Sequence, residues 1–119
     1  MQDLNRVSSG LDRRRSERLL LDLPVLVEGQ SDGHGHFQEE TFTVLVNAHG
    51  AVIMLAATVV LGQMLVVVNS KTREQLEGRV VQRGHQYGGM TKIAIEFVRP
   101  APEFWHVSSL PESWKANTF

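Results

Sequence analysis

Arginine is concentrated near the start of the chain, where it offers anion-binding chemistry. Residues 1–18 hold five arginines against three acidic residues, whereas the rest of the chain holds seven basic and ten acidic groups. Arg13, Arg14 and Arg15 are consecutive, and Arg18 follows shortly after them. A guanidinium group can bind two anionic oxygens through parallel hydrogen bonds. A local cationic segment on a mildly acidic body favours a small anionic ligand over a long polyanion, so we expect no binding of DNA or RNA.

No residue pattern in the chain points to catalysis. The sequence contains no cysteine, which excludes thiolate zinc sites and cysteine nucleophiles. It also lacks the motifs of serine hydrolases, zinc proteases and P-loop proteins. His34 and His36 lie close to Asp32, but a glycine-rich loop without a further placed ligand makes a poor metal site. We therefore predict no enzyme activity, no catalytic residue, no metal site and no cofactor.

Six segments have the residue types of short β-strands and are separated by glycine-rich or polar breaks. They cover residues 23–28, 37–47, 51–57, 64–69, 75–83 and 92–98. The last segment alternates, with Ile93, Ile95 and Phe97 on one face. The glycine-rich stretch 29–36 is expected to be a loop, and 84–89 a turn. This series predicts an all-β domain, either a sandwich or a small barrel.

One feature between these strands and one after them bear on how the domain closes. The corner Ala48-His49-Gly50 separates two apolar runs, and we expect Gly50 to supply an unusual backbone angle there. Beyond the last strand, Phe104, Trp105 and Trp114 are expected to cover the core. A short helical turn around Glu103–Val107 is predicted, entered through a proline.

The length of the chain predicts a single domain with short extensions. We place a flexible basic arm at residues 1–18, the β-domain at 19–107 and a C-terminal tail at 108–119. No apolar run is long enough to cross a membrane, and the first residues lack an apolar leader segment. We therefore expect no membrane insertion and a cytoplasmic location.

Two motifs and their placement resemble the PilZ family. Arg14 and Arg18 match its R-x-x-x-R motif just before the first predicted strand, with Arg15 between them. The stretch from Leu45 to Gly50 resembles a degenerate form of its second motif, [D/N]-x-S-x-x-G. The resemblance covers roughly residues 11–107 and implies a six-stranded antiparallel β-barrel in a single-domain protein.

The resemblance also implies a ligand and a function. PilZ domains bind cyclic di-GMP, a bacterial second messenger that carries two phosphates and two guanines. The residues implied to bind it are Arg14, Arg15, Arg18, Asn47, His49 and Gly50. Arginine can bind phosphate or the guanine edge, and glycine allows close backbone approach. Such a receptor would change its interactions with a protein partner when the ligand binds.

A second function remains open, a PilZ-fold adaptor that works by protein contact without cyclic di-GMP. Leu45 stands where the family has an acidic or amide acceptor, and leucine accepts no hydrogen bond. On this interpretation Asn47, His49 and Gly50 form a structural turn, and the arginines only solvate the arm. In both cases we expect an unidentified protein partner, and a homodimer is one form that such an interaction could take.

Overall fold

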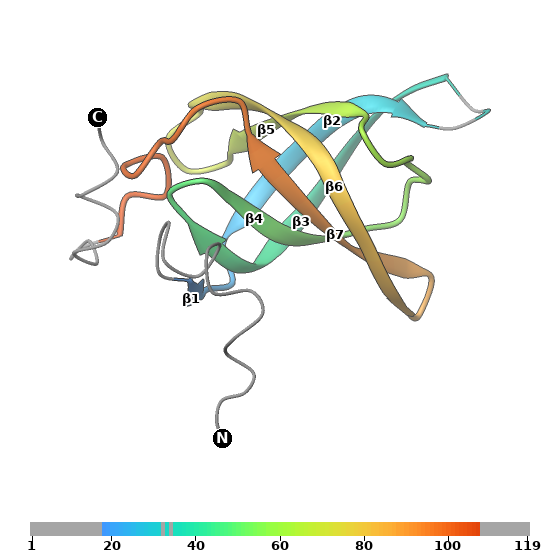
Figure 1. Cartoon of the computed structure of the whole chain (residues 1–119), viewed down its shortest axis with the longest axis horizontal. Helices are drawn as coiled ribbons and strands as arrows, with labels where there is room; N and C mark the ends of the chain where they lie inside the picture. Colours follow the sequence, from blue (N-terminus) through green and yellow to red (C-terminus); the bar gives the residue numbers. More distant parts are fainter. Residues whose placement is uncertain (1–17, 32, 34, 108–119) are drawn as a thin grey trace.

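A closed six-stranded antiparallel β-barrel with one extra short strand makes up the fold (Figure 1). The computed structural model describes residues 18–31, 33 and 35–107. The strands are β1 (Leu19–Leu20), β2 (Pro24–Ser31), β3 (Gly35–Asn47), β4 (Gly50–Leu55), β5 (Met64–Asn69), β6 (Gln75–Tyr87) and β7 (Met90–Phe97). Around the barrel the order is β3-β2-β5-β6-β7-β4, and pairing of β4 with β3 closes it. The predicted all-β barrel is confirmed.

Two stretches predicted as loop or turn belong largely to strands. β2 and β3 continue through most of residues 29–36, and β6 continues to Tyr87 inside the stretch 84–89. The second turn consists only of Gly88 and Gly89, whose φ angles are 57° and 87°. Two consecutive residues with positive φ form a tight hairpin that suits the twist of paired strands. Glycine content therefore marked these turns correctly but overstated their length.

Aliphatic side chains fill the barrel because apolar residues alternate along each strand and point inward. The fully buried ones include Val25, Val27, Ile53, Leu55, Leu65, Val67, Val80 and Ile93. Phe97, the last residue of β7, covers this core together with Phe104 and Trp105 from the segment that follows. The ring centroids of Phe97 and Trp105 are 5.8 Å apart and stacked, and Phe104 meets Trp105 edge-on at 4.8 Å. Phe104 and Trp105 thus take the predicted covering position, while Trp114 lies outside the described residues.

The segment after β7 is not helical, contrary to the prediction for Glu103–Val107. Backbone hydrogen bonds join Phe104 N–H to the Ala101 carbonyl and His106 N–H to the Glu103 carbonyl, each at 3.1 Å. His106 has a φ of 54°, which ends this pair of turns before a helix can form. No helix occurs in the described ranges. These ranges therefore contain no helix that could cross a membrane.

The end of β7 and the turns after it hold the hairpin between β3 and β4 in place. The three consecutive carbonyls of Asn47, Ala48 and His49 accept hydrogen bonds from Trp105 Nε1 (3.1 Å), Ala101 N (2.7 Å) and Phe97 N (2.7 Å), respectively. Because Ala48 and His49 lie in the turn, outside the β3–β4 ladder, these bonds satisfy carbonyl groups that would otherwise need water. The aromatic cover and the hairpin are therefore one connected unit.

A buried hydroxyl group connects the segment after β1 to β3. Thr43, only 1% exposed, donates to the Leu21 carbonyl oxygen at 2.6 Å and accepts from the Leu23 N–H at 3.0 Å. The Thr43 N–H also donates to the Leu23 carbonyl oxygen at 2.9 Å. These contacts fix the path of the chain between β1 and β2, and with it the point at which Arg18 reaches the barrel.

We expect Thr43→Val to lower the free energy of unfolding by about 1–3 kcal/mol, because valine keeps the shape but leaves two part-buried backbone groups without a partner. Urea denaturation measures this change. Thr43→Ser retains the hydroxyl group and is expected to lose less stability than the valine variant. A valine variant as stable as the wild type would show that the hydroxyl group does not anchor this segment.

Candidate ligand-binding site

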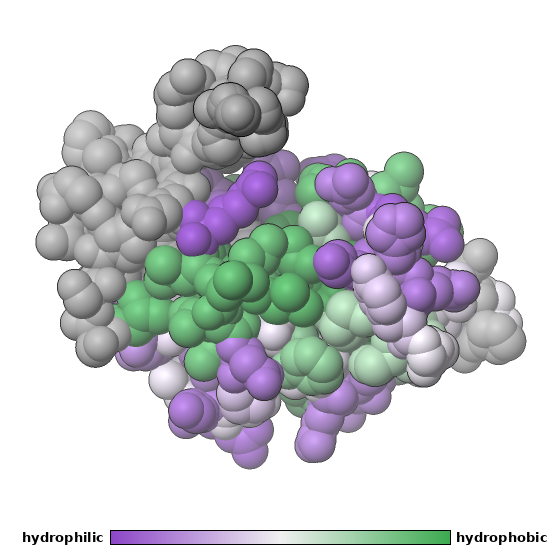
Figure 2. All heavy atoms as spheres, turned by 90° about the horizontal axis from the view of Figure 1, so that it is seen from below, coloured by the Kyte–Doolittle hydropathy of each residue, from purple (hydrophilic) through white to green (hydrophobic). Residues whose placement is uncertain are grey.

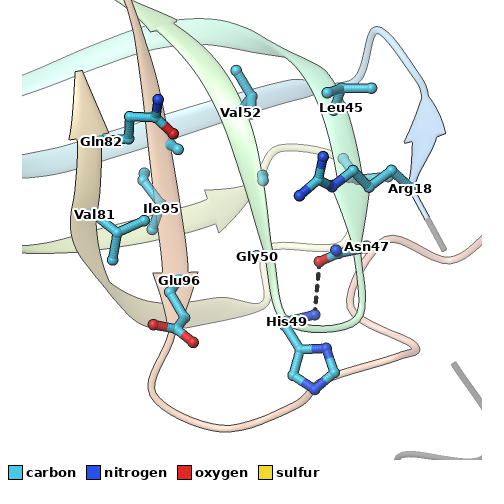
Figure 3. A pocket seen from close by; sticks show the side chains of 13 residues that line it. Arg18, Leu45, Asn47, His49, Gly50, Val52, Val81, Gln82, Ile95 and Glu96 are labelled. Carbon is cyan, nitrogen blue, oxygen red and sulfur yellow. Dashed lines mark hydrogen bonds between the residues drawn. The ribbon is translucent and has the colours of Figure 1, made fainter. Parts of the chain in front are cut away.

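A hollow of about 430 Å³ lies on the outer face of the barrel, over β4 (Figure 3). This volume falls within the roughly 300–1,000 Å³ that is typical of small-molecule sites. Its outward-facing apolar lining comes from Leu45, Val52, Val81 and Ala94. Its polar lining comes from Arg18, Asn47, His49, Gln82 and Glu96. The hollow thus combines an apolar floor with hydrogen-bonding groups on both sides.

Four of the six residues predicted to bind the ligand line this hollow. They are Arg18, Asn47, His49 and Gly50. Arg14 and Arg15 lie outside the described residues, as do most of the predicted arm and the tail at 108–119. Arg18 meets the three hairpin residues because β1 pairs with β3 just before the β3–β4 hairpin.

The position of Arg18 follows from the short strand β1. In the β1–β3 pairing, Leu19 lies opposite Val46 and Leu20 opposite Leu45. Arg18 immediately precedes Leu19, so it reaches β3 beside Asn47. Its guanidinium group extends from there toward β4, into the hollow (Figure 3).

Asn47 shapes the hairpin and contributes to the hollow. Its Oδ1 accepts a hydrogen bond from the His49 N–H at 2.9 Å, while Asn47 and Gly50 face each other across the ladder. An asparagine oxygen that bonds the backbone two residues later is a common way to stabilise a tight turn. The amide oxygen is therefore engaged in the turn, and the amide nitrogen is the group that Asn47 can offer to a ligand.

Gly50 does not supply an unusual backbone angle, and that prediction was wrong. Its φ is not among the positive values, which among described glycines belong to Gly33, Gly35, Gly62, Gly88 and Gly89. A Cβ at Gly50 would instead collide with the Ile95 carbonyl oxygen, and it would lie 3.0 Å from the Ile95 carbonyl carbon. Glycine is required because the backbones of β4 and β7 approach too closely for any side chain. It also leaves the floor open between the two sides of the hollow.

Two β-bulges flank the hollow and change the direction in which some of its lining side chains point. The register of β3 against β4 shifts between Thr43 and Leu45, and that of β6 against β7 shifts between Val80 and Gln82. A bulge puts two residues opposite one and turns a side chain out of the regular alternation. Val81 is 46% exposed at the second bulge. The contribution of Val81 to the apolar floor is therefore a consequence of the bulge rather than of strand alternation.

The far side of the hollow carries polar residues that the sequence did not single out. Glu96 on β7 lies opposite Gly50 of β4 and opposite Arg79 of β6 in the two ladders. Gln82 follows the bulge in β6 and also lines the hollow. The alternation of residues 92–98 already placed Glu96 on the face opposite Ile95. The missing information was that β7 lies next to β4, which is a non-local contact.

A metal centre finds no support in the described part of the chain. No group of three histidine, aspartate or glutamate side chains there is arranged to hold a metal ion. His36 is exposed at the start of β3, while Asp32 and His34 lie outside the described residues. The chemistry of the candidate site is therefore that of an arginine, a carboxylate, amides and an imidazole around an apolar floor.

Comparison with known proteins gave no assignment. No protein-family model matches the chain, and no curated protein matches it. The fold and the site define a small β-barrel with a mixed apolar and polar hollow on its outer wall. The function of this hollow has to be inferred from its own residues.

Proposed function

We propose that this protein is a PilZ-like receptor that binds cyclic di-GMP in the hollow over β4. The observation that carries the proposal is that Arg18, which is distant in the sequence from the hairpin residues Asn47, His49 and Gly50, lines one hollow of suitable size together with them. The proposed ligand set also includes Arg14 and Arg15, outside the described residues. The receptor would act in the bacterial cytoplasm and change its contacts with a protein partner when the nucleotide binds.

The chemistry of the lining suits a cyclic dinucleotide. Arg18 can bind a phosphate oxygen pair or stack on a guanine face. The flat apolar faces of the guanines can rest on Val52 and Ala94, where burial of apolar area stabilises binding. Leu45 adds to this floor, and the hydrogen bonds come from Asn47 and His49 at the hairpin.

Replacement of Arg18 tests this proposal. We expect Arg18→Ala to weaken cyclic di-GMP binding about ten- to hundredfold, because a hydrogen bond to a charged group contributes about 1.5–3 kcal/mol. Isothermal titration calorimetry measures the dissociation constants. The matched control is Arg83→Ala, since Arg83 is exposed on β6 and does not line the hollow.

Two outcomes would contradict the receptor proposal. The first is a folded wild-type protein that gives no binding heat with cyclic di-GMP. The second is an equal loss of affinity in the Arg18 and Arg83 variants, which would show only a general effect of charge. A selective loss at Arg18 supports the site as described.

A second candidate function is protein contact without the nucleotide. The observation that favours it is a continuous apolar area on the face that carries β3 and β4 (Figure 2). Leu45, Val52 and Val81 line the hollow on the outer wall, where a partner could cover them. Size-exclusion chromatography with and without cyclic di-GMP tests this function. It predicts self-association or partner binding that does not change when the nucleotide is added.

A further inference from the structure

We propose that Glu96 recognises the Watson–Crick edge of a guanine in the bound ligand and so makes the site selective for guanine over adenine. This inference rests on the proposed function, because it concerns the same hollow and the same ligand class. It assigns a specificity role to a residue that lies outside both sequence motifs. It also explains how the site could select guanine although Leu45 accepts no hydrogen bond.

The geometry places Glu96 across the hollow from the arginine. Arg18 and Asn47 line the hollow from the β3 side, and Glu96 lines it from β7. Gly50 of β4 lies between the two sides, opposite Glu96 in the ladder, and has no side chain to separate them (Figure 3). A ligand resting on Gly50 can therefore contact a cation on one side and a carboxylate on the other.

This arrangement of charge restricts the ligands that fit. A carboxylate only accepts hydrogen bonds, and it repels a phosphate. The ligand must therefore offer donors to Glu96 and its anion to Arg18. A guanine nucleotide meets both demands, because N1–H and the N2 amino group are adjacent donors on one edge. The corresponding edge of adenine presents the N1 lone pair, which a carboxylate repels.

The guanine edge and the carboxylate match in number as well as in type. Two parallel N–H groups can donate to the two oxygens of one carboxylate, as a guanidinium group does. Glu96 also has Arg79 as its neighbour on β6 in the ladder. A carboxylate has about four lone-pair sites, so contact with a neighbouring cation leaves acceptor capacity for the base.

Removal of the Glu96 carboxylate shows whether it recognises guanine or only repels the phosphates, because the two roles change the binding affinity in opposite directions. If Glu96 only repels the phosphates, Glu96→Ala should tighten the binding of every cyclic dinucleotide. If Glu96 accepts from guanine, the same change should weaken cyclic di-GMP binding about ten- to hundredfold and leave cyclic di-AMP binding unchanged or tighter. The preference for guanine over adenine should then fall by about the same factor.

The experiment is a calorimetric titration of the full chain with cyclic di-GMP and with cyclic di-AMP. The variants are Glu96→Ala, the isosteric Glu96→Gln, and Glu77→Ala as a control that removes an exposed acid of β6 outside the hollow. Glu96→Gln preserves the volume and is expected to lie between wild type and Glu96→Ala, because one amide oxygen still accepts. Arg18→Ala should weaken both ligands by similar factors.

The outcomes separate this inference from the function on which it rests. Wild-type binding of cyclic di-GMP, with a guanine preference that survives in both Glu96 variants, overturns the role of Glu96 and leaves the receptor intact. Tighter binding of both ligands by Glu96→Ala overturns it as well. A wild-type protein that binds neither ligand overturns the receptor and this inference together. Loss of guanine preference in the Glu96 variants, but not in Glu77→Ala, supports it.

Discussion

Trp105→Ala is expected to lower the free energy of unfolding by about 3–5 kcal/mol, the range for truncation of a large buried aromatic side chain. Trp105 is only 3% exposed, stacks on Phe97 and meets Phe104 edge-on. Its Nε1 also donates to the Asn47 carbonyl oxygen at 3.1 Å. Truncation therefore opens a cavity over the core and removes one of the three bonds that hold the β3–β4 hairpin.

Thermal and urea unfolding of matched variants measure this effect. Trp105→Phe keeps an aromatic ring but no donor, so we expect a smaller loss than for alanine. Tyr87→Ala serves as the control, because Tyr87 is 55% exposed on the β6–β7 hairpin, and it should change stability by about 0.5 kcal/mol or less. If Trp105→Ala and Tyr87→Ala had the same small effect, Trp105 would not be part of the core.

Gly50→Ala is expected to lower stability by about 1–3 kcal/mol, as overpacking does in a well-packed core. The new Cβ would meet the backbone of Ile95 and lie 3.2 Å from the Glu96 Cα, so β4 and β7 must move apart. Because Gly50 also forms the floor of the hollow, we expect the same variant to weaken cyclic di-GMP binding. Both effects have one cause, the loss of close contact between two strands.

A glycine outside the hollow provides the control for this prediction. A Cβ at Gly84 would lie 3.5 Å from the nearest atoms of Lys92, an ordinary contact distance. We therefore expect Gly84→Ala to leave both stability and nucleotide affinity close to wild type. Urea unfolding and calorimetry of the two variants test this contrast. Equal effects at Gly50 and Gly84 would contradict the explanation by close strand approach.

Strand alternation allowed much of the fold to be predicted. The regular pattern at 92–98 corresponds closely to β7, and the apolar segment 64–69 coincides with β5. The sequence did not reveal β1, because Leu19–Leu20 is too short to show a period. It also misjudged the ends of β2, β3 and β6, where exposed strands form hairpins beyond the core. Such strands carry polar residues on both faces, so their composition resembles that of a loop.

The candidate site was predictable only on its β3 side. Arg18, Asn47, His49 and Gly50 are marked by motif or by turn chemistry, and all four line the hollow. Glu96 and Gln82 could not be assigned to it from sequence, because that requires knowing that β7 pairs with β4 and β6 with β7. The bulges are a second reason. The register shift between Thr43 and Leu45 changes which side chains face outward, and the two-residue alternation of a regular strand does not predict this change.

The most direct test of the central claim is an NMR titration of the isotope-labelled protein with cyclic di-GMP, followed through backbone amide shifts. Binding in the hollow over β4 predicts that the largest changes cluster at residues 47–51 and 94–96, on its two sides. Residues 26–30 of β2, none of which lines the hollow, serve as the internal reference and should change little. The account would be contradicted by largest shifts at 26–30 with 47–51 unchanged, or by no shifts with about 1 mM ligand.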